Sequence, residues 1–147
     1  MAEYEWARLR ADELRKYSQD DTVVILPVAA LEQHGPHLPV MVDSRLVEEV
    51  SKRTASLGGD KGIPIITLPV VWHGLSEHHM PFGGTVTLTS NTFFLIVRDL
   101  IKSISRHGFS KFLILNGHGG NITAAEVCAQ DISLSLIHIS EPTRRTT

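Results

Sequence analysis

The stretch "TVVILPV" at residues 22–28 decides the fold, because its residues are β-branched or apolar with no polar side chain alternating between them after the first. A strand that is apolar on both faces is typical of a parallel sheet that helices cover on both sides. Two further runs, "IPIITLPVVW" at 63–72 and "KFLIL" at 111–115, have the same character. We therefore predict three buried, parallel strands.

Helical patterns precede and follow the first strand. Residues 2–17 place apolar side chains at helical spacing among Arg and Glu, which predicts an amphipathic helix. A second helix is expected to begin at an N-cap supplied by Asp43-Ser44 and to run to about residue 57. Its buried stripe is predicted to contain Leu46, Val47 and Val50.

The later part of the chain repeats the alternation of strand and helix. "TVTLT" at 85–89 is predicted to be a short alternating strand. A helix capped by Ser90 or Asn91 should follow and end at Gly108, and another helix should begin at Ile122 with Cys128 in its core. The predicted fold class is α/β, a mostly parallel sheet flanked by helices.

The composition describes an ordinary globular domain of 147 residues, 42% hydrophobic and 20% charged. A net charge of −2 gives no reason to expect nucleic acid or an anionic membrane as a partner. The longest apolar run, residues 23–31, is too short to span a bilayer, and the charged start lacks a secretory signal. The lone Cys128 fits a reducing compartment, so a cytoplasmic location is predicted.

The end of the chain, "LSLIHISEPTRRTT" at 134–147, resembles the conceptual translation of a sequencing adapter. We therefore expect residues 1–133 to be a truncated α/β domain whose C-terminal part is missing, and residues 134–147 to be a non-native, adapter-derived tail. A genuine C-terminal tail is the alternative. Because His138 lies in the adapter-like tail, it is left out of the site prediction.

Three polar loops follow the three predicted strands: "ALEQHGPH", "HGLSEHH" and "NGHGGN". In α/β folds the functional sites lie beyond the carboxyl ends of the strands. All three loops are therefore expected at the same edge of the sheet, where their histidines and carboxylates would meet.

Glu32 and His34 stand two residues apart in a segment that prolines keep extended. Their side chains are therefore expected on the same face, with Cα atoms about 6.5 Å apart. Each of the two could hold one of two neighbouring metal ions, with Asp43 between the ions and His118 added from the third loop. This mixed nitrogen and oxygen set suits zinc, manganese or iron. Ordinary hydrogen-bonded loop residues are the alternative, and His37 could replace His34 in a His-x-x-His pattern.

The segments "LPVAALEQHGPHLPVMVD", "GLSEHHMPFGGTVTL" and "HGFSKFLILNGHGGN" resemble the creatininase family of metal-dependent amidohydrolases over residues 22–130. The resemblance implies a creatininase-like α/β fold and two divalent metal ions, zinc, manganese or iron. It places their ligands at Glu32, His34, Asp43 and His118, with Asp43 as the bridging ligand.

Gly120 departs from the creatinine-cleaving members, which have a glutamate there. The resemblance is therefore closer to the branch of the formamidopyrimidine-type deformylases and the mycofactocin-precursor peptidase. Members of that branch take a further carboxylate from a downstream His-Ala-Gly-Glu stretch, which this chain does not contain. The chain is expected to lack that ligand.

The loop residues beside the predicted metals have roles that remain hypotheses. The glycines of "NGHGG", with free N–H groups at Gly119 and Gly120, would stabilise an oxyanion, and Asn116 and Asn121 would orient the loop. Glu77 and His78 would carry protons to the leaving nitrogen. Ordinary turn asparagines and a solvated loop are the alternatives.

The sequence thus predicts a metal-dependent amidohydrolase. It would hydrolyse a C–N amide bond of a small molecule or short peptide with a hydroxide that two metal ions activate. By family resemblance, the full-length protein would be a homo-oligomer. A catalytically inactive truncated fragment and a metal-free, ligand-binding α/β domain are the alternative functions.

Overall fold

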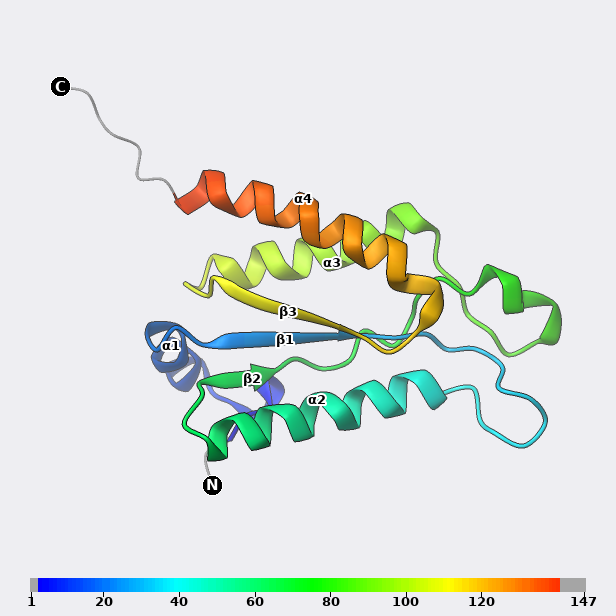
Figure 1. The fold of residues 1–147 in the computed structure, drawn as a ribbon, viewed down its shortest axis with the longest axis horizontal. Helices are drawn as coiled ribbons and strands as arrows, with labels where there is room; N and C mark the ends of the chain where they lie inside the picture. Colours follow the sequence, from blue (N-terminus) through cyan, green and yellow to red (C-terminus); the bar gives the residue numbers. More distant parts are fainter. Residues whose placement is uncertain (1–2, 141–147) are drawn as a thin grey trace.

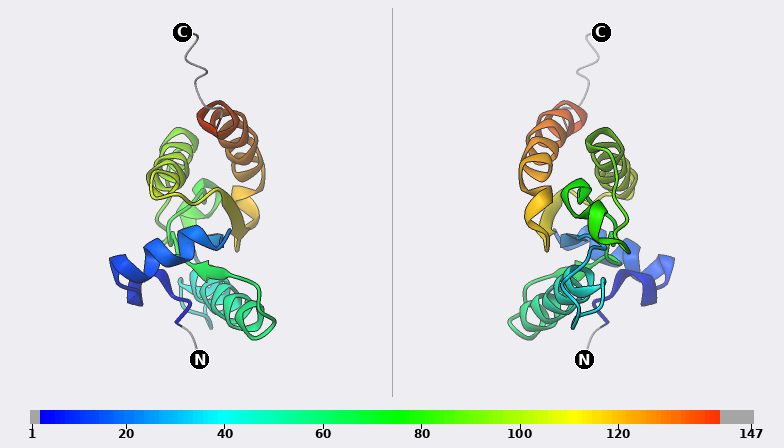
Figure 2. Two further views of the ribbon diagram at one scale, coloured as in Figure 1. Left: turned by 90° about the vertical axis from the view of Figure 1, so that its left-hand side faces the viewer. Right: turned by 90° about the vertical axis from the view of Figure 1, so that its right-hand side faces the viewer.

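The computed structural model describes residues 3–140, without the side chains of 136–140. Within these residues a three-stranded parallel sheet has the order β2-β1-β3, which confirms the predicted α/β fold. In Figures 1 and 2, α2 lies on one side of the sheet, and α3 and α4 lie on the other. The elements are η1 (Trp6–Arg8), α1 (Ala11–Gln19), β1 (Val23–Val28), α2 (Val42–Asp60), β2 (Ile65–Thr67), η2 (Glu77–Phe82), α3 (Ser90–Ser105), β3 (Lys111–Asn116), η3 (Gly119–Asn121) and α4 (Ile122–Ser140).

β1 is the central strand, and its residues from Val24 onward are buried, as predicted. Val24 pairs with Ile66 of β2 on one side and with Phe112 of β3 on the other. Pro27 fits in this strand because its carbonyl accepts from Val71 N–H on the β2 side, past the end of β2. The N–H that proline lacks would have pointed to the same side, where β2 has already ended. The sheet therefore loses no hydrogen bond at Pro27.

Two hydrophobic clusters hold the layers together. The larger one joins β1 to α3 and α4, and it includes the fully buried Phe93, Val97 and Cys128. The burial of Cys128 confirms its predicted place in a helix core. The smaller cluster joins Val24 to Phe109 and to side chains of the N-terminal segment.

Two of the predicted strands differ from what the structure shows: one is shorter, and the other does not form. β2 occupies only Ile65–Thr67 of the run at 63–72, because the prolines that flank it remove backbone donors. Residues 85–89 do not form a strand but make isolated bridges, from Val86 to Leu31 and from Thr87 to Gly74. These bridges nonetheless connect the loops that follow β1 and β2.

The predicted helix over 2–17 is interrupted. η1 and α1 are separate, and α1 begins after Arg10, whose N–H donates to the Glu13 carboxylate at 2.8 Å. The cap of α3 is Thr89, which accepts from Thr92 N–H, and not Ser90 or Asn91.

The predicted Asp43-Ser44 cap of α2 is also wrong, because Met41 is the residue at that position. Ser44 instead donates from Oγ to the carbonyls of Ala30 and Trp72, at 2.9 and 3.1 Å. Both polar side chains of the first turn are thus used in tertiary contacts.

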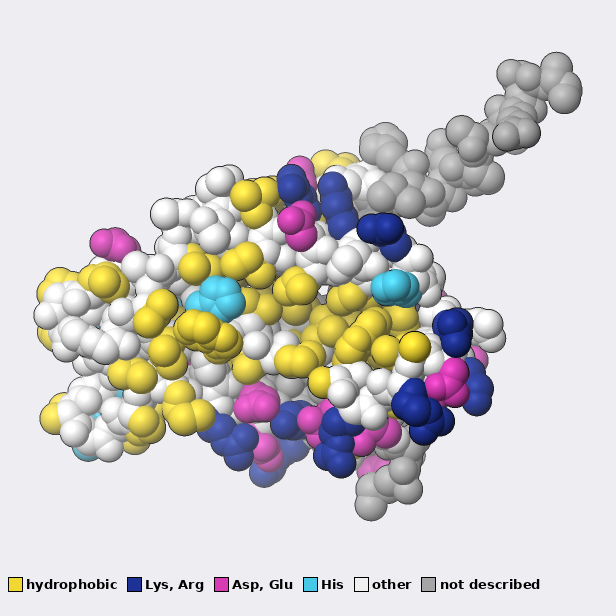
Figure 3. Space-filling view, turned by 180° about the vertical axis from the view of Figure 1, so that it is seen from behind, with side chains coloured by type: hydrophobic (Ala, Val, Ile, Leu, Met, Phe, Trp, Pro, Cys, Tyr) yellow, Lys and Arg dark blue, Asp and Glu magenta, His cyan; other side chains and the backbone are white. Residues whose placement is uncertain are grey.

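The burial predictions hold only in part. On α2 Val47 is buried, whereas Leu46 and Val50 are 60% and 51% exposed. No residue of β3 is fully buried: Phe112 and Ile114 on one face are half-buried, and Leu113 on the other is 42% exposed, so the predicted buried strand is wrong here. Figure 3 shows hydrophobic side chains spread across the back of the molecule, with charged side chains along its lower edge.

Two further observations concern the chain as a whole. Among the described residues, no helix has the length and apolar character needed to cross a membrane. α4 runs through the expected junction at Leu134 to Ser140, and residues 141–147 of the expected tail lie outside the described residues.

Candidate metal centre

The loops after β1, β2 and β3 meet at one edge of the sheet, on the right in Figure 1. Glu32 lies in the segment after β1, and His118 lies directly after β3. Asp43 stands in the first turn of α2. Ligand atoms of these three residues lie within 4.8 Å of one another.

His118 is buried and presents one ring nitrogen to the two carboxylates. Its Nε2 lies 2.9 Å from the Leu75 carbonyl, which can only accept, so we assign the ring proton to Nε2. Nδ1 then carries a lone pair, and it lies 2.8 Å from Asp43 Oδ2 and 3.4 Å from Glu32 Oε1.

His34 has the same arrangement with its ring nitrogens exchanged. Nδ1 lies 3.1 Å from the backbone carbonyl of Glu32, so the ring proton belongs there. Nε2 then presents its lone pair to Asp43 Oδ1 at 3.1 Å. Histidines that bind metals commonly donate their other ring N–H to a backbone carbonyl in this way.

Asp43 therefore has one imidazole on each of its two carboxylate oxygens. Its Oδ2 atom is buried and has no hydrogen-bond donor, although His118 Nδ1 is near, because the direction of approach does not suit a hydrogen bond. Burial and the negative charge of Glu32 raise the pKa of Asp43 above its ordinary value.

Glu32 is held differently at its two oxygens. Oε2 accepts from Ser76 Oγ at 2.8 Å and lies 2.6 Å from His79 Nδ1, while Oε1 faces His118. Burial opposes its ionisation, but the Ser76 hydroxyl and the neighbouring histidines keep the pKa of Glu32 below its ordinary value.

These four side chains fit divalent cations better than they fit one another. Two unprotonated ring nitrogens lie 2.8 and 3.1 Å from the Asp43 oxygens without the alignment of a hydrogen bond, and their like partial charges repel unless a positive charge lies between. A cation on each side of Asp43 would remove this repulsion and satisfy the orphaned Oδ2. The set of carboxylate oxygens and imidazole nitrogens is suited to zinc, manganese or iron.

The structure also decides between the two histidines considered for the extended segment. His34 reaches Asp43, whereas His37 is exposed and lies in a loop that turns at Gly35, where φ is +75°. The geometry therefore favours the pair of Glu32 and His34 as candidate ligands over the alternative in which His37 replaces His34.

The glycine loop is fixed by its two asparagines. Asn116 Nδ2 donates to the His118 carbonyl at 2.7 Å, and Asn116 Oδ1 accepts from His118 N–H. Asn121 is fully buried, accepts from Leu75 N–H and donates to the Ala29 carbonyl, each at 2.9 Å. Because backbone partners occupy both amides, the asparagines orient the loop, and any contact with a substrate stays a prediction.

Of the two central glycines, only Gly120 is required for steric reasons. A Cβ at Gly120 would lie 2.3 Å from the Leu75 carbonyl and 2.5 Å from His118 Nε2, whereas a Cβ at Gly119 would meet nothing within 4 Å. Their N–H groups precede that of Asn121, which is the first helical donor and bonds the His118 carbonyl, so helix geometry gives them no partner.

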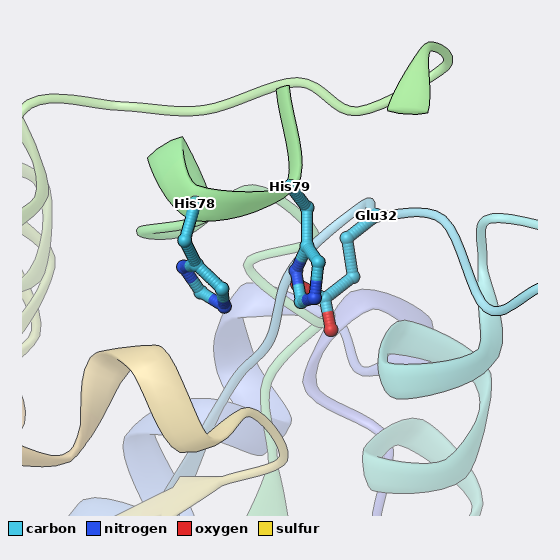
Figure 4. A group of neighbouring side chains, drawn as sticks. All are labelled: Glu32, His78 and His79. Carbon is cyan, nitrogen blue, oxygen red and sulfur yellow. The ribbon is translucent and has the colours of Figure 1, made fainter. Parts of the chain in front are cut away.

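Sequence reasoning missed Ser76 and His79. Ser76 is fully buried between Glu32 and His118, and His79 reaches Glu32 from η2. Figure 4 shows His78 and His79 projecting from η2 beside Glu32. The loop "HGLSEHH" contains both Ser76 and His79, but the sequence does not reveal which of its histidines the short helix turns inward.

Glu77 and His78 are exposed and line a groove of about 450 Å³ that also touches Gly120. The ring of His78 lies 6.2 Å from that of His118, nearly parallel to it. The groove therefore adjoins the proposed metal-binding set, by which we mean Glu32, His34, Asp43 and His118. The proton-carrying roles of Glu77 and His78 stay predictions.

The fold and this cluster define a parallel α/β domain with a candidate metal centre at the carboxyl edge of its sheet. Comparison with known families gives a match to the family described as "Creatininase: Creatinine amidohydrolase" over residues 7–141. The chain belongs to the creatininase family.

Three known proteins illustrate the relationship. The mycofactocin precursor peptide peptidase of Mycolicibacterium smegmatis is 34% identical over 103 residues, which cover 69% of this chain and 41% of the relative. The creatinine amidohydrolase of Pseudomonas putida is 35% identical over 106 residues, 69% of this chain and 39% of the relative. A solved structure named "Creatininase Mn" superposes with a TM-score of 0.83 at 30% identity, covering 95% of this chain and 54% of the other. The chain thus spans well under two thirds of these relatives' length.

Proposed function

We propose that this chain carries the metal-binding part of an amidohydrolase that cuts a C–N amide bond in a small molecule or short peptide. The observation that carries the proposal is that an imidazole nitrogen lies within 3.1 Å of each oxygen of the buried Asp43 carboxylate. Membership of the creatininase family supports the same function. The activity of the whole protein is part of the proposal, because the relatives are longer.

The proposed cofactor is a pair of divalent ions, zinc, manganese or iron. Glu32, Asp43 and His118 would hold one ion, and His34 with Asp43 would hold the other, so that Asp43 bridges. Such ions polarise a carbonyl oxygen and lower the pKa of water. The manganese in the name of a similar creatininase structure supports a divalent metal.

The chain's own residues would position the substrate and handle charge. The N–H groups of Gly119 and Gly120 stand at the exposed start of η3, where they would donate to the oxygen of a tetrahedral intermediate. His78 lines the adjoining groove and would protonate the departing nitrogen, with Glu77 assisting. Asn116 and Asn121 would keep the loop in place through their backbone hydrogen bonds.

The groove gives the proposal a size range. Its volume of about 450 Å³ lies within the usual range of small-molecule sites, roughly 300–1,000 Å³. Because Gly120 stands where the creatinine-cleaving members have a glutamate, the proposed substrate is an amide other than creatinine. The peptidase named among the relatives supports a peptide-like amide.

We also propose that the full-length protein is a homo-oligomer. On α2, Leu46, Val50 and Leu57 are 60%, 51% and 61% exposed, although each is a large apolar side chain. Exposed apolar side chains gathered on one element are typical of an interface between protein chains.

The test is metal content measured together with hydrolysis. The chain is loaded with zinc or manganese, dialysed, and analysed by mass spectrometry of the metal, and creatinine, small formamides and short peptides are then offered. Two ions per chain with chelator-sensitive amide hydrolysis support the proposal. One ion or none without hydrolysis indicates an inactive fragment, and thermal unfolding that neither zinc nor chelator changes indicates a metal-free domain.

A further inference from the structure

His79 contacts the metal-binding set without facing Asp43. It belongs to η2, and its Nδ1 lies 2.6 Å from Glu32 Oε2. The two side chains are 25% and 7% exposed, so the contact is shielded from most of the solvent. Unlike the approach of His118 to Asp43 Oδ2, this contact has the direction of a hydrogen bond.

Glu32 Oε2 also accepts from the fully buried Ser76 hydroxyl, at 2.8 Å. A carboxylate oxygen has two lone-pair sites, so the two donors together occupy Oε2. Oε1 makes no such contact and faces His118 Nδ1 at 3.4 Å. Glu32 is thus held asymmetrically, with one oxygen engaged and the other directed at the metal-binding set.

The surrounding backbone holds the His79 ring in this place. His79 N–H donates to the Ser76 carbonyl at 3.0 Å, and the His79 carbonyl accepts from Thr85 Oγ1 at 3.3 Å. Thr85 Oγ1 in turn accepts from Gln33 N–H at 3.2 Å. The residue next to Glu32 and the residue that contacts its carboxylate are therefore tied together through one threonine.

An ion bound by Glu32, His78 and His79 is the competing explanation, since their ligand atoms lie within 4.8 Å of one another. Two observations favour a hydrogen bond instead. The Ser76 hydroxyl already occupies one site on the same oxygen, and His78 is exposed and lines the groove.

We propose that His79, together with Ser76, is a positioning residue that holds Glu32 Oε2 and leaves Oε1 as the oxygen that binds the cation. This inference rests on the proposed metal-binding function. Fixing Glu32 in one orientation before the ion arrives lowers the entropy lost on binding and favours coordination through a single oxygen. Hydrogen-bonding partners of metal ligands typically contribute about 10- to 100-fold in metal affinity.

The experiment measures zinc affinity by competition with a chromophoric chelator, using the 147-residue chain. His79→Leu removes the donor, whereas His79→Asn keeps an N–H close to the position of Nδ1. His78→Ala is the matched control for the neighbouring imidazole. We expect zinc affinity to fall about 10- to 100-fold in His79→Leu, to recover to within about threefold in His79→Asn, and to stay unchanged in His78→Ala.

Cobalt absorption supplies a readout that loss of general stability would not change. When the His79 donor is removed, Glu32 Oε2 keeps only the Ser76 hydroxyl and becomes available to the ion, so the coordination number should rise and the visible bands of Co²⁺ should weaken in His79→Leu. His79→Asn should restore them. Thermal unfolding of each variant in chelator shows whether the metal-free fold is retained.

The outcomes separate this inference from the proposed function. If the unaltered chain binds no zinc, both are overturned. If it binds zinc and His79→Leu binds equally tightly with the same cobalt spectrum, only the positioning role is overturned. Equal losses in His79→Asn and His78→Ala would show an ion held by the two imidazoles, which also overturns it.

Discussion

Replacing Asp43 with asparagine should have opposite effects on the metal-free and the metal-loaded protein. In the metal-free chain Asp43 is a buried carboxylate beside a second carboxylate, and its Oδ2 atom has no donor. The asparagine amide is uncharged and can donate to one of the facing ring nitrogens. Relief of one unsatisfied buried group is worth about 1 kcal/mol. For a chain of this size, that free energy corresponds to a rise in Tm of roughly 3 °C.

The order should reverse with zinc. One ion at 100 times its Kd stabilises the native state by about 2.7 kcal/mol, which corresponds to roughly 8 °C in Tm. Asp43→Asn should gain none of this, because an uncharged amide with a single oxygen cannot bridge two cations. Thermal unfolding followed by circular dichroism measures the Tm of the unaltered chain and of Asp43→Asn, each in chelator and in zinc. An asparagine variant that zinc stabilises as much as the unaltered chain would refute the reasoning.

The stability difference in chelator should also depend on pH. Because the pKa of Asp43 in the folded chain is raised above its ordinary value, ionisation of this carboxyl group disfavours the folded state. This penalty is complete above the raised pKa and disappears as the pH falls to the ordinary carboxyl value. The advantage of Asp43→Asn should therefore be largest near neutral pH and shrink in acid. An advantage that grew as the pH fell would contradict the assigned direction.

Three further predictions use simpler readouts. His34→Ala should lower the zinc content by one ion, whereas Asp43→Ala should remove both; full zinc content in the aspartate variant would show that it does not bridge. Gly120→Ala should cost about 1–3 kcal/mol in unfolding free energy, since its Cβ would lie 2.3 Å from a backbone carbonyl, whereas Gly119→Ala should cost under about 1 kcal/mol. Equal costs in denaturant titrations would count against the close approach. Burial raises the pKa of the Cys128 thiol, so alkylation should require unfolding; rapid labelling of the native chain would contradict its place in the core.

The strands were predictable because their apolar runs have one explanation. Val24 to Val28 are buried on both faces, as a continuous apolar segment requires. Strand lengths were less predictable, since they depend on what lies beside each strand. Leu113 is exposed because nothing among the described residues covers that face of β3, and no property of Leu113 itself reveals this.

The candidate metal ligands could be proposed from the sequence, but the hydrogen bonds that hold them in place could not. The polar loops could be placed at one edge because parallel strands end at the same edge of a sheet, and Glu32 indeed lies near His118. The pairing of Ser76 and His79 with Glu32 arises from the short helix η2, whose orientation is set by tertiary contacts. The failed cap at Asp43 has the same origin, because its carboxylate is directed to the site and not to the helix N-terminus.

The central claim is that two cations lie on either side of Asp43, and anomalous diffraction at the zinc edge tests it most directly. Crystals of the zinc-loaded chain should give two peaks that flank this carboxylate, one beside Glu32 and His118 and the other beside His34. Each should lie about 2.0–2.2 Å from its ligand atoms. A map with no peak at Asp43, or with its zinc only between His78 and His79, would contradict the account.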